Sequence, residues 1–179
     1  SKHHRNRNWA PAPQPLPEDA HVIDNHTHVA SVVPFSQAMS HEAMEKGQGE
    51  VPVYSVDELL EQAQKVGVEG VIDCGCELPN LMTAIDMARE HPGTVHAAIA
   101  IHPNEAVLHG HRGAPGPDGL PIKYKPWHDI PFDEAMAEVH RLATTYPNQV
   151  VAIGETGMDL FRTGEGAKEL QREARSEEH

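Results

Sequence analysis

Near the N-terminus, an apolar run gives way to residues of the types that bind metal ions. Residues 21–29 read His-Val-Ile-Asp-Asn-His-Thr-His-Val, so Asp24, His26 and His28 stand two positions apart. Side chains of a β-strand alternate between its two faces, and this spacing therefore predicts all three on one face. Two imidazoles beside a carboxylate are typical of half of a divalent-metal site. The alternative is a pair of ordinary core or surface histidines.

Three later runs, at 68–74, 95–101 and 150–154, have the nearly continuous apolar character of buried parallel strands. Polar residues stand at or just after the ends of these runs: Cys74 and Cys76, His102, and Glu155 and Asp159. The carboxyl ends of parallel strands meet at one face of a barrel. We therefore expect these side chains to converge with the histidine pair.

Glu155 completes the predicted site. With His26 and His28 it gives two nitrogen donors and a carboxylate, a ligand set for Zn²⁺, Mg²⁺ or Mn²⁺. A carboxylate also bridges two ions about 3.5 to 4 Å apart, the spacing that holds a nucleophile against a phosphoryl or carbonyl group. We predict that these three residues are metal ligands and that Asp24 supports them from behind.

Four other residues leave alternatives open. His102 is a ligand, a contact to a substrate phosphate, or a strand-end histidine bonded to the backbone, and we assign it to substrate binding. Asp159 is better explained as the cap of a following helix than as a ligand. Cys74 and Cys76 are too close along a strand for an ordinary disulfide, so we interpret them as small buried residues in a reducing compartment.

Helical patterns separate the apolar runs. Ser55 and Glu58 have the spacing of a capping box, at the start of a helix that Gly67 ends. Residues 30–54 are expected to form a long connection with a short helix at 40–47. Further helices are predicted at 79–91, at 132–146 and from 164 onward. Strands that alternate with helices in this way predict a parallel α/β fold with four strand–helix units.

Two stretches stand apart from this alternation. Residues 1–20 form a proline-rich arm, which we expect to be an extended strap or a tail. Residues 103–130 are rich in proline and glycine and are expected to form an inserted loop without a core of its own. The remainder of 21–179 is predicted to be one α/β domain, although a complete barrel typically needs about 250 residues.

The composition narrows the classes of function. Asp and Glu outnumber Lys and Arg by 27 to 14, which gives a net charge of −13 and argues against tight, sequence-independent binding to a phosphate backbone. The sequence shows neither the run of about 18 to 20 apolar residues that a membrane span needs nor the apolar core of a signal peptide. We therefore expect a cytoplasmic protein.

Three segments resemble the motifs of the TatD family of metal-dependent hydrolases: 24–28 (Asp-Asn-His-Thr-His), 101–103 (Ile-His-Pro) and 151–159 (Val-Ala-Ile-Gly-Glu-Thr-Gly-Met-Asp). The last of these is the most specific, and the likeness extends over roughly 20–179. The resemblance implies a (β/α)₈ metallohydrolase barrel of the TIM type, of which this chain resembles the N-terminal half. Family members continue with strands that carry two more metal-binding histidines and a water-activating aspartate, and we find no counterpart of these in residues 160–179.

The resemblance also implies an activity. Family members hydrolyse their substrates, usually phosphodiesters as in a nuclease, with two divalent ions and metal-activated water. His26 and His28 correspond to the pair that binds the first ion, and Glu155 to the bridging and catalytic carboxylate. The expected substrates are phosphodiesters, DNA ends included, or small molecules.

Two alternatives to a nuclease remain open. The same water activation serves a hydrolase of amides or esters. Alternatively, the chain is a non-catalytic fragment or interaction module, because a half barrel has open edge strands. Such a module needs a second copy or a complementing C-terminal half as its partner.

Overall fold

The computed structural model describes residues 14–114, 124–161, 163 and 165–177. Its elements are, in chain order, β1 (Val22–Thr27), α1 (Val29–Glu45), α2 (Val56–Lys65), β2 (Val68–Gly75), α3 (Leu78–Glu90), β3 (Val95–Ile99), α4 (Pro103–Ala106), a 3₁₀ helix (Pro126–Asp129), α5 (Phe132–Thr145), β4 (Val150–Ile153) and α6 (Glu165–Glu177). No helix within these described ranges combines the length and apolar character that a membrane crossing requires.

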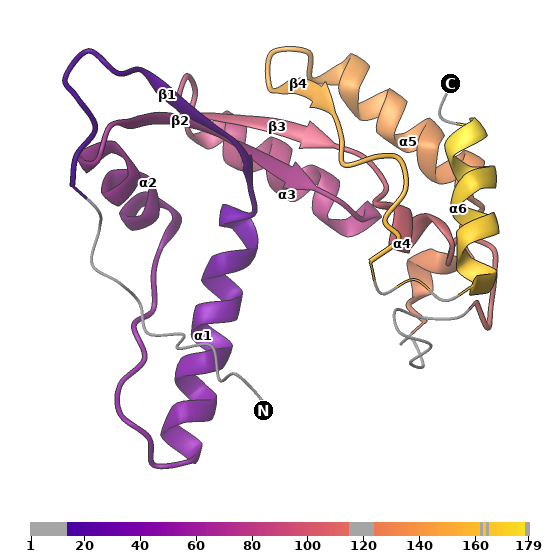
Figure 1. Cartoon of the computed structure of the whole chain (residues 1–179), viewed down its shortest axis with the longest axis horizontal. Coiled ribbons are helices and arrows are strands. Elements are labelled where there is room, and N and C mark those ends of the chain that lie inside the picture. Colours follow the sequence, from indigo (N-terminus) through magenta and orange to yellow (C-terminus); the bar gives the residue numbers. More distant parts are fainter. Residues whose placement is uncertain (1–13, 115–123, 162, 164, 178–179) are drawn as a thin grey trace.

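The four strands form one parallel sheet in the order β1-β2-β3-β4, with helices in the connections (Figure 1). This confirms the predicted parallel α/β arrangement of four strand–helix units. The arrangement follows from the apolar character of β2 and β3. Each of these two strands lies between two other strands of the sheet. Within the described sheet, β1 and β4 each pair with a single neighbour and are its two edges.

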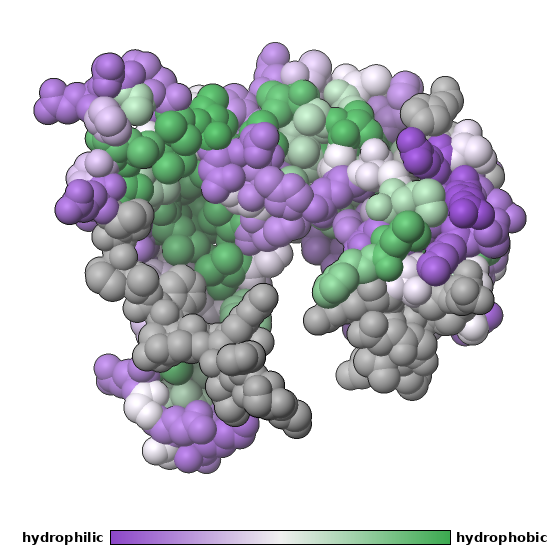
Figure 2. All heavy atoms as spheres, in the orientation of Figure 1, coloured by the Kyte–Doolittle hydropathy of each residue, from purple (hydrophilic) through white to green (hydrophobic). Residues whose placement is uncertain are grey.

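The core forms where α3 and α5 pack beside the inner strands. Leu81 and Ile85 of α3, Ile99 of β3, and Val139 and Leu142 of α5 are all buried. Apolar side chains of the edge strands are far more accessible: Ile23 of β1 and Val151 and Ile153 of β4 are each more than half exposed. Figure 2 shows this apolar surface in the region of β1 and β4. The hydrophobic core is therefore centred on β2 and β3 and thins towards both edges.

Helix α1 corrects the predicted connection at 30–54. It runs for 17 residues from Val29 to Glu45, with Pro34 inside it, and projects away from the sheet (Figure 1). A proline inside a helix removes one backbone donor, and its ring crowds a carbonyl of the preceding turn. The residues after Pro34 include Gln37, Ala38 and Met39, which are good helix formers, so the helix continues past the proline.

The proline- and glycine-rich stretch at 103–130 has more structure than expected. It contains α4 and the 3₁₀ helix, and Val107 and Leu108 pack with Ala167 of α6 in a small apolar cluster. Buried His128 bonds Glu105 of α4 at 2.7 Å, which joins the two ends of the stretch to each other. The expectation of a loop without a core is wrong for these residues, and 115–123 lie outside the described part.

The end of the proline-rich arm is a strap. The backbone N–H of Leu16 donates to the carbonyl of Val66 at 2.9 Å, at the turn between α2 and β2. A Cβ atom at Gly67 would lie 3.0 Å from the Leu16 side chain, and Gly67 has a positive φ of 97°. Only glycine fits this turn without strain. Residues 1–13 of the arm lie outside the described part of the chain.

The capping box of α2 forms as predicted. The Ser55 hydroxyl accepts from the Glu58 N–H at 3.1 Å, and the Glu58 carboxylate accepts from the Ser55 N–H at 2.8 Å. We expect Ser55→Ala to lower the free energy of unfolding by about 1 kcal/mol, measured by urea denaturation. Ser40→Ala, inside α1, removes a hydroxyl that caps nothing and is the control. An equal loss in both variants would show that the cap contributes no specific stability.

Candidate metal centre

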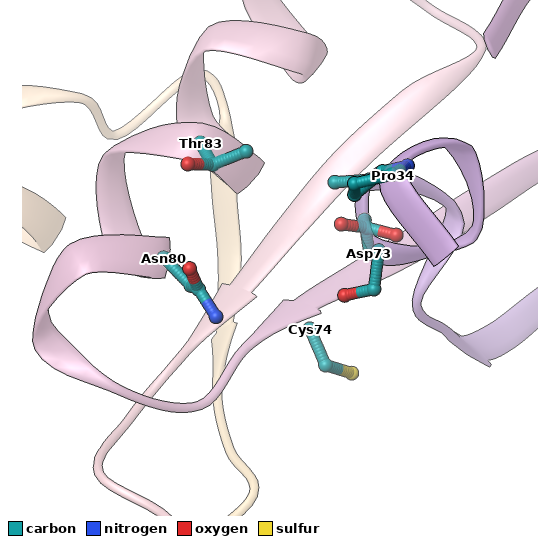
Figure 3. Close-up of a pocket in the computed structure, with 7 residues that line it drawn as sticks. Pro34, Asp73, Cys74, Asn80 and Thr83 are labelled. Carbon is teal, nitrogen blue, oxygen red and sulfur yellow. The ribbon is translucent and has the colours of Figure 1, made fainter. Parts of the chain in front are cut away.

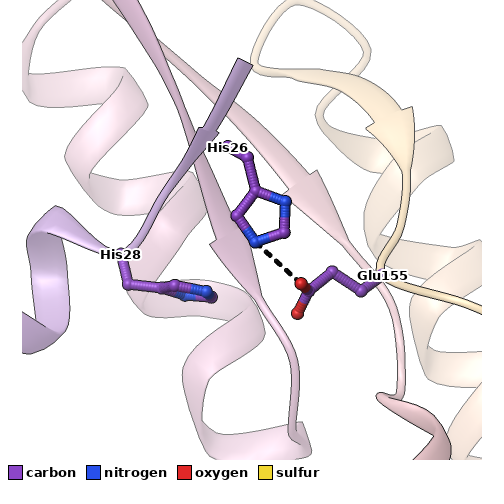
Figure 4. Close-up of side chains that lie close together, drawn as sticks. All are labelled: His26, His28 and Glu155. Atoms are coloured by element: carbon purple, nitrogen blue, oxygen red, sulfur yellow. Dashed lines mark ion pairs between the residues drawn. The ribbon is translucent and has the colours of Figure 1, made fainter. Parts of the chain in front are cut away.

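Three residues predicted as ligands lie together at the carboxyl end of the sheet. His26 comes from the end of β1, His28 from the start of α1 and Glu155 from the segment after β4, and their potential ligand atoms lie within 4.8 Å of one another (Figure 4). The Nε2 atom of His26 is 2.7 Å from Oε1 of Glu155, and the two imidazole rings meet edge to face at 5.3 Å. The fold therefore brings together residues that are far apart in sequence.

The end of β1 departs from the simple alternation that the sequence suggested. The pairing of β1 with β2 shifts between Asp24 and Thr27, and His28 lies beyond the strand, at the N-cap position of α1. The Asp24 carboxylate accepts from the backbone N–H of His26 at 3.2 Å. Asp24 therefore bonds the backbone at the place where the register of β1 shifts, and His28 is the cap of a helix rather than the next residue of the strand.

The orientation of His28 is set by β2. Its Nδ1 atom lies 3.3 Å from the carbonyl oxygen of Cys74, and a carbonyl can only accept, so Nδ1 carries the proton. The Nε2 atom then has a free lone pair. A histidine that donates one ring N–H to a backbone carbonyl and presents its other nitrogen is the usual arrangement of a metal-binding imidazole.

Glu155 is held from two sides. His26 contacts its Oε1 atom, and the Cys76 thiol donates to its Oε2 atom at 3.0 Å. Burial raises the pKa of the Cys76 thiol, and the Glu155 carboxylate raises it further, so the thiol stays protonated and can donate. Cys74 is buried as predicted, whereas Cys76 is only half-buried and contacts the site. In the sequence, only the position of Cys76 just after β2 indicated that it contacts the site.

His102 lies beside the three-residue cluster without joining it. Its Nδ1 atom accepts from the backbone N–H of Asn104 at 3.1 Å, which makes His102 the N-cap of α4. Its Nε2 atom is 4.0 Å from Oδ2 of Asp159. The Nδ1 edge of His102 is therefore bonded to the backbone, as in one of the alternatives. Its Nε2 edge faces the loop after β4.

Asp159 does not cap a helix, because α6 begins only at Glu165. Its carboxylate instead accepts from the Asn104 amide at 2.9 Å and from the Phe161 N–H at 3.0 Å. Gln171 of α6, fully buried, donates to Asn104 and to the Asp159 carbonyl, both at 3.1 Å, and accepts from the Asp159 N–H at 3.0 Å. This amide network ties α4, α6 and the loop after β4 together. The sequence patterns gave no indication of it.

The donor set fits a divalent metal ion. Two imidazoles and one carboxylate, converging at a single place, are the composition of catalytic sites that bind Zn²⁺ or a similar ion and leave coordination positions open. Side-chain exposures of 51% for His26 and 29% for Glu155 leave the site open to solvent. Its three donors thus leave room for further ligands or substrate.

A parallel sheet that carries such donors at its carboxyl end is typical of TIM-type α/β proteins. Solved structures that share this fold include the following two. A hydrolase TatD family protein from Entamoeba histolytica superposes with a TM-score of 0.58 at 18% identity, over 87% of this chain and 44% of that one. YJJV, a TatD homolog from Escherichia coli K12, gives 0.54 at 24% identity, over 88% and 44%.

The sequence itself matches the family model described as TatD related DNase over residues 23–176. It is also 32% identical over 124 residues to a Mycobacterium tuberculosis protein described as an uncharacterized metal-dependent hydrolase TatD. The chain therefore belongs to the TatD family of metal-dependent hydrolases. It covers 38% of that relative and 44% of each solved structure, so it spans less than half the length of these proteins.

Proposed function

We propose that this chain contributes the first part of the active site of a metal-dependent phosphodiester hydrolase. The observation that carries the proposal is the convergence of His26, His28 and Glu155 within 4.8 Å at the carboxyl end of a parallel sheet. A divalent ion bound there would lower the pKa of a water molecule and polarise the bond to be cleaved. Two such ions are expected in a complete site.

The side chains of this chain have distinct tasks in the proposal. His26 and His28 would hold the ion, and Glu155 would be both ligand and catalytic carboxylate. Cys76 keeps one oxygen of Glu155 in place. His102 binds substrate, because its Nε2 edge is partly accessible and an imidazole N–H is a good donor to a phosphate oxygen.

The charge of the chain limits the substrate. A net charge of −13 repels a long polyanion, which favours small phosphodiesters or the ends of DNA over a long duplex. The free thiols of Cys74 and Cys76 fit a reducing compartment and support a cytoplasmic site of action.

The test is a hydrolysis assay with Mn²⁺, Mg²⁺ or Zn²⁺ on bis(p-nitrophenyl) phosphate and on a short single-stranded DNA. We expect product release that EDTA abolishes and that Glu155→Gln reduces by about 100-fold, because a positioned carboxylate contributes roughly that factor. Glu134→Gln, at an exposed position of α5, is the matched control and should leave the rate unchanged. Cleavage of p-nitrophenyl acetate or an anilide in place of the phosphodiesters would favour an ester or amide hydrolase.

An interaction module is the second candidate function. It is favoured by the edges of β1 and β4, each with one neighbouring strand in the described sheet, and by the 38–44% coverage of the relatives. In this case the purified chain binds metal and releases no product. Activity then requires a complementing C-terminal half, supplied as the part of the Mycobacterium tuberculosis relative that follows the matched region, or a second copy of the chain.

A further inference from the structure

His28 occupies a position in α1 that usually has another task. It is the N-cap residue of this helix, where Ser, Thr, Asp or Asn normally accept from the first free N–H groups. The His28 side chain makes no capping bond, and its ring is turned towards His26 and Glu155 (Figure 4). The first turn of α1 therefore needs an acceptor from elsewhere.

Asp73 of β2 supplies that acceptor. Its Oδ1 atom accepts from the backbone N–H of Val29 at 2.5 Å and from the Thr27 hydroxyl at 3.3 Å, and the N–H of Ala30 also bonds this carboxyl group. Thr27 and Asp73 are paired residues of neighbouring strands. Asp73 is 1% exposed and lies between β2 and the first turns of α1 (Figure 3). One buried side chain thus bonds the residues on both sides of His28.

We propose that Asp73 is a positioning residue for His28. By capping α1 from the neighbouring strand, it fixes the backbone at 27–30, and the Cys74 carbonyl then fixes the ring through Nδ1. Two consecutive residues of β2 thereby direct the Nε2 atom of His28 into the site. The inference rests on the proposed function, because it assumes that His28 is a ligand.

The capping role needs an oxygen acceptor more than a negative charge. Burial raises the pKa of the Asp73 carboxyl, while the N–H groups of Val29 and Ala30 partly oppose this, and an acceptor oxygen is present in either protonation state. A pocket of about 350 Å³, lined by Ala30, Asp73 and Thr83 among others, adjoins the cap. When the carboxyl group is removed, water can enter this space and bond the amides of Val29 and Ala30. Such a water molecule would not fix the backbone at 27–30.

Zinc affinity measured by competition with a chromophoric chelator tests the proposal. Asp73→Ala should weaken Zn²⁺ binding by about 10-fold to 100-fold, the range for residues that orient a ligand. Asp73→Asn keeps an acceptor oxygen and should stay within about threefold of the wild type. Ala43→Gly weakens α1 far from His28 and should leave the affinity unchanged. Hydrogen exchange on the wild type should show protected Val29 and Ala30 amides.

Several results would overturn the role of Asp73. These are an unchanged affinity in Asp73→Ala, an equal loss in Ala43→Gly, or unprotected Val29 and Ala30 amides in the wild type. The exchange measurement needs no variant, so unprotected amides would refute the cap, and with it the positioning role, even when Asp73→Ala does not fold. If His28→Ala also leaves the Zn²⁺ affinity unchanged, the proposed metal site itself is wrong. If His28→Ala weakens Zn²⁺ binding and Asp73→Ala does not, only the positioning role of Asp73 is wrong.

Discussion

Replacing His26 with alanine should weaken Zn²⁺ binding by about 100-fold or more. Residues that only orient a ligand already contribute 10-fold to 100-fold to metal affinity, and His26 is one of three proposed donors. The loss should be visible by isothermal titration calorimetry, with the fold checked by circular dichroism. The same substitution should abolish any metal-dependent hydrolysis.

His140 provides the matched control for this experiment. It is an exposed histidine of α5, outside the candidate site, and His140→Ala removes an imidazole of the same chemistry. We expect its Zn²⁺ affinity to equal that of the wild type. Equal losses in both variants would mean that the 14 histidines of the chain bind zinc non-specifically.

Ile99→Ala should lower the free energy of unfolding by about 3 kcal/mol, the largest stability effect that we predict. Ile99 is completely buried in β3 within the main core, so its removal loses transfer free energy and leaves a cavity. Chemical denaturation monitored by circular dichroism measures the change. Cavity formation in the core, rather than loss of a strand, is the cause, because alanine keeps the backbone bonds of the sheet.

Ile153 is the register partner of Ile99 in β4 and provides the internal control. It is 53% exposed, and we expect Ile153→Ala to cost less than about 1 kcal/mol. A cost as large as that of Ile99→Ala would show that a second copy or another partner covers β4 in solution.

The sequence was a good guide to the fold wherever its patterns are local. Continuous apolar runs predicted β2, β3 and β4, and Ser55 with Glu58 marked the start of α2. The helix α1 was predicted only at 40–47, because a proline such as Pro34 is unfavourable inside a helix.

The sequence indicated which residues form the candidate site, but not which contacts hold them in place. His26, His28 and Glu155 share the ends of strands, and the topology alone brings them together. The contacts of Asp73 with Val29 and of Cys76 with Glu155 depend on the register between β1 and β2 and on the path after β4. Such tertiary details leave no periodic trace in the sequence. The register shift between Asp24 and Thr27 is a tertiary detail of the same kind.

The most direct test of the central claim is X-ray absorption at the zinc edge on the Zn²⁺-loaded chain. We predict scattering from two imidazoles and an oxygen, with Zn–N distances of about 2.0 to 2.1 Å. His26→Ala should remove one imidazole from the spectrum. A shell without imidazole, or one dominated by sulfur at about 2.3 Å, would contradict the assignment of His26, His28 and Glu155 as the metal site.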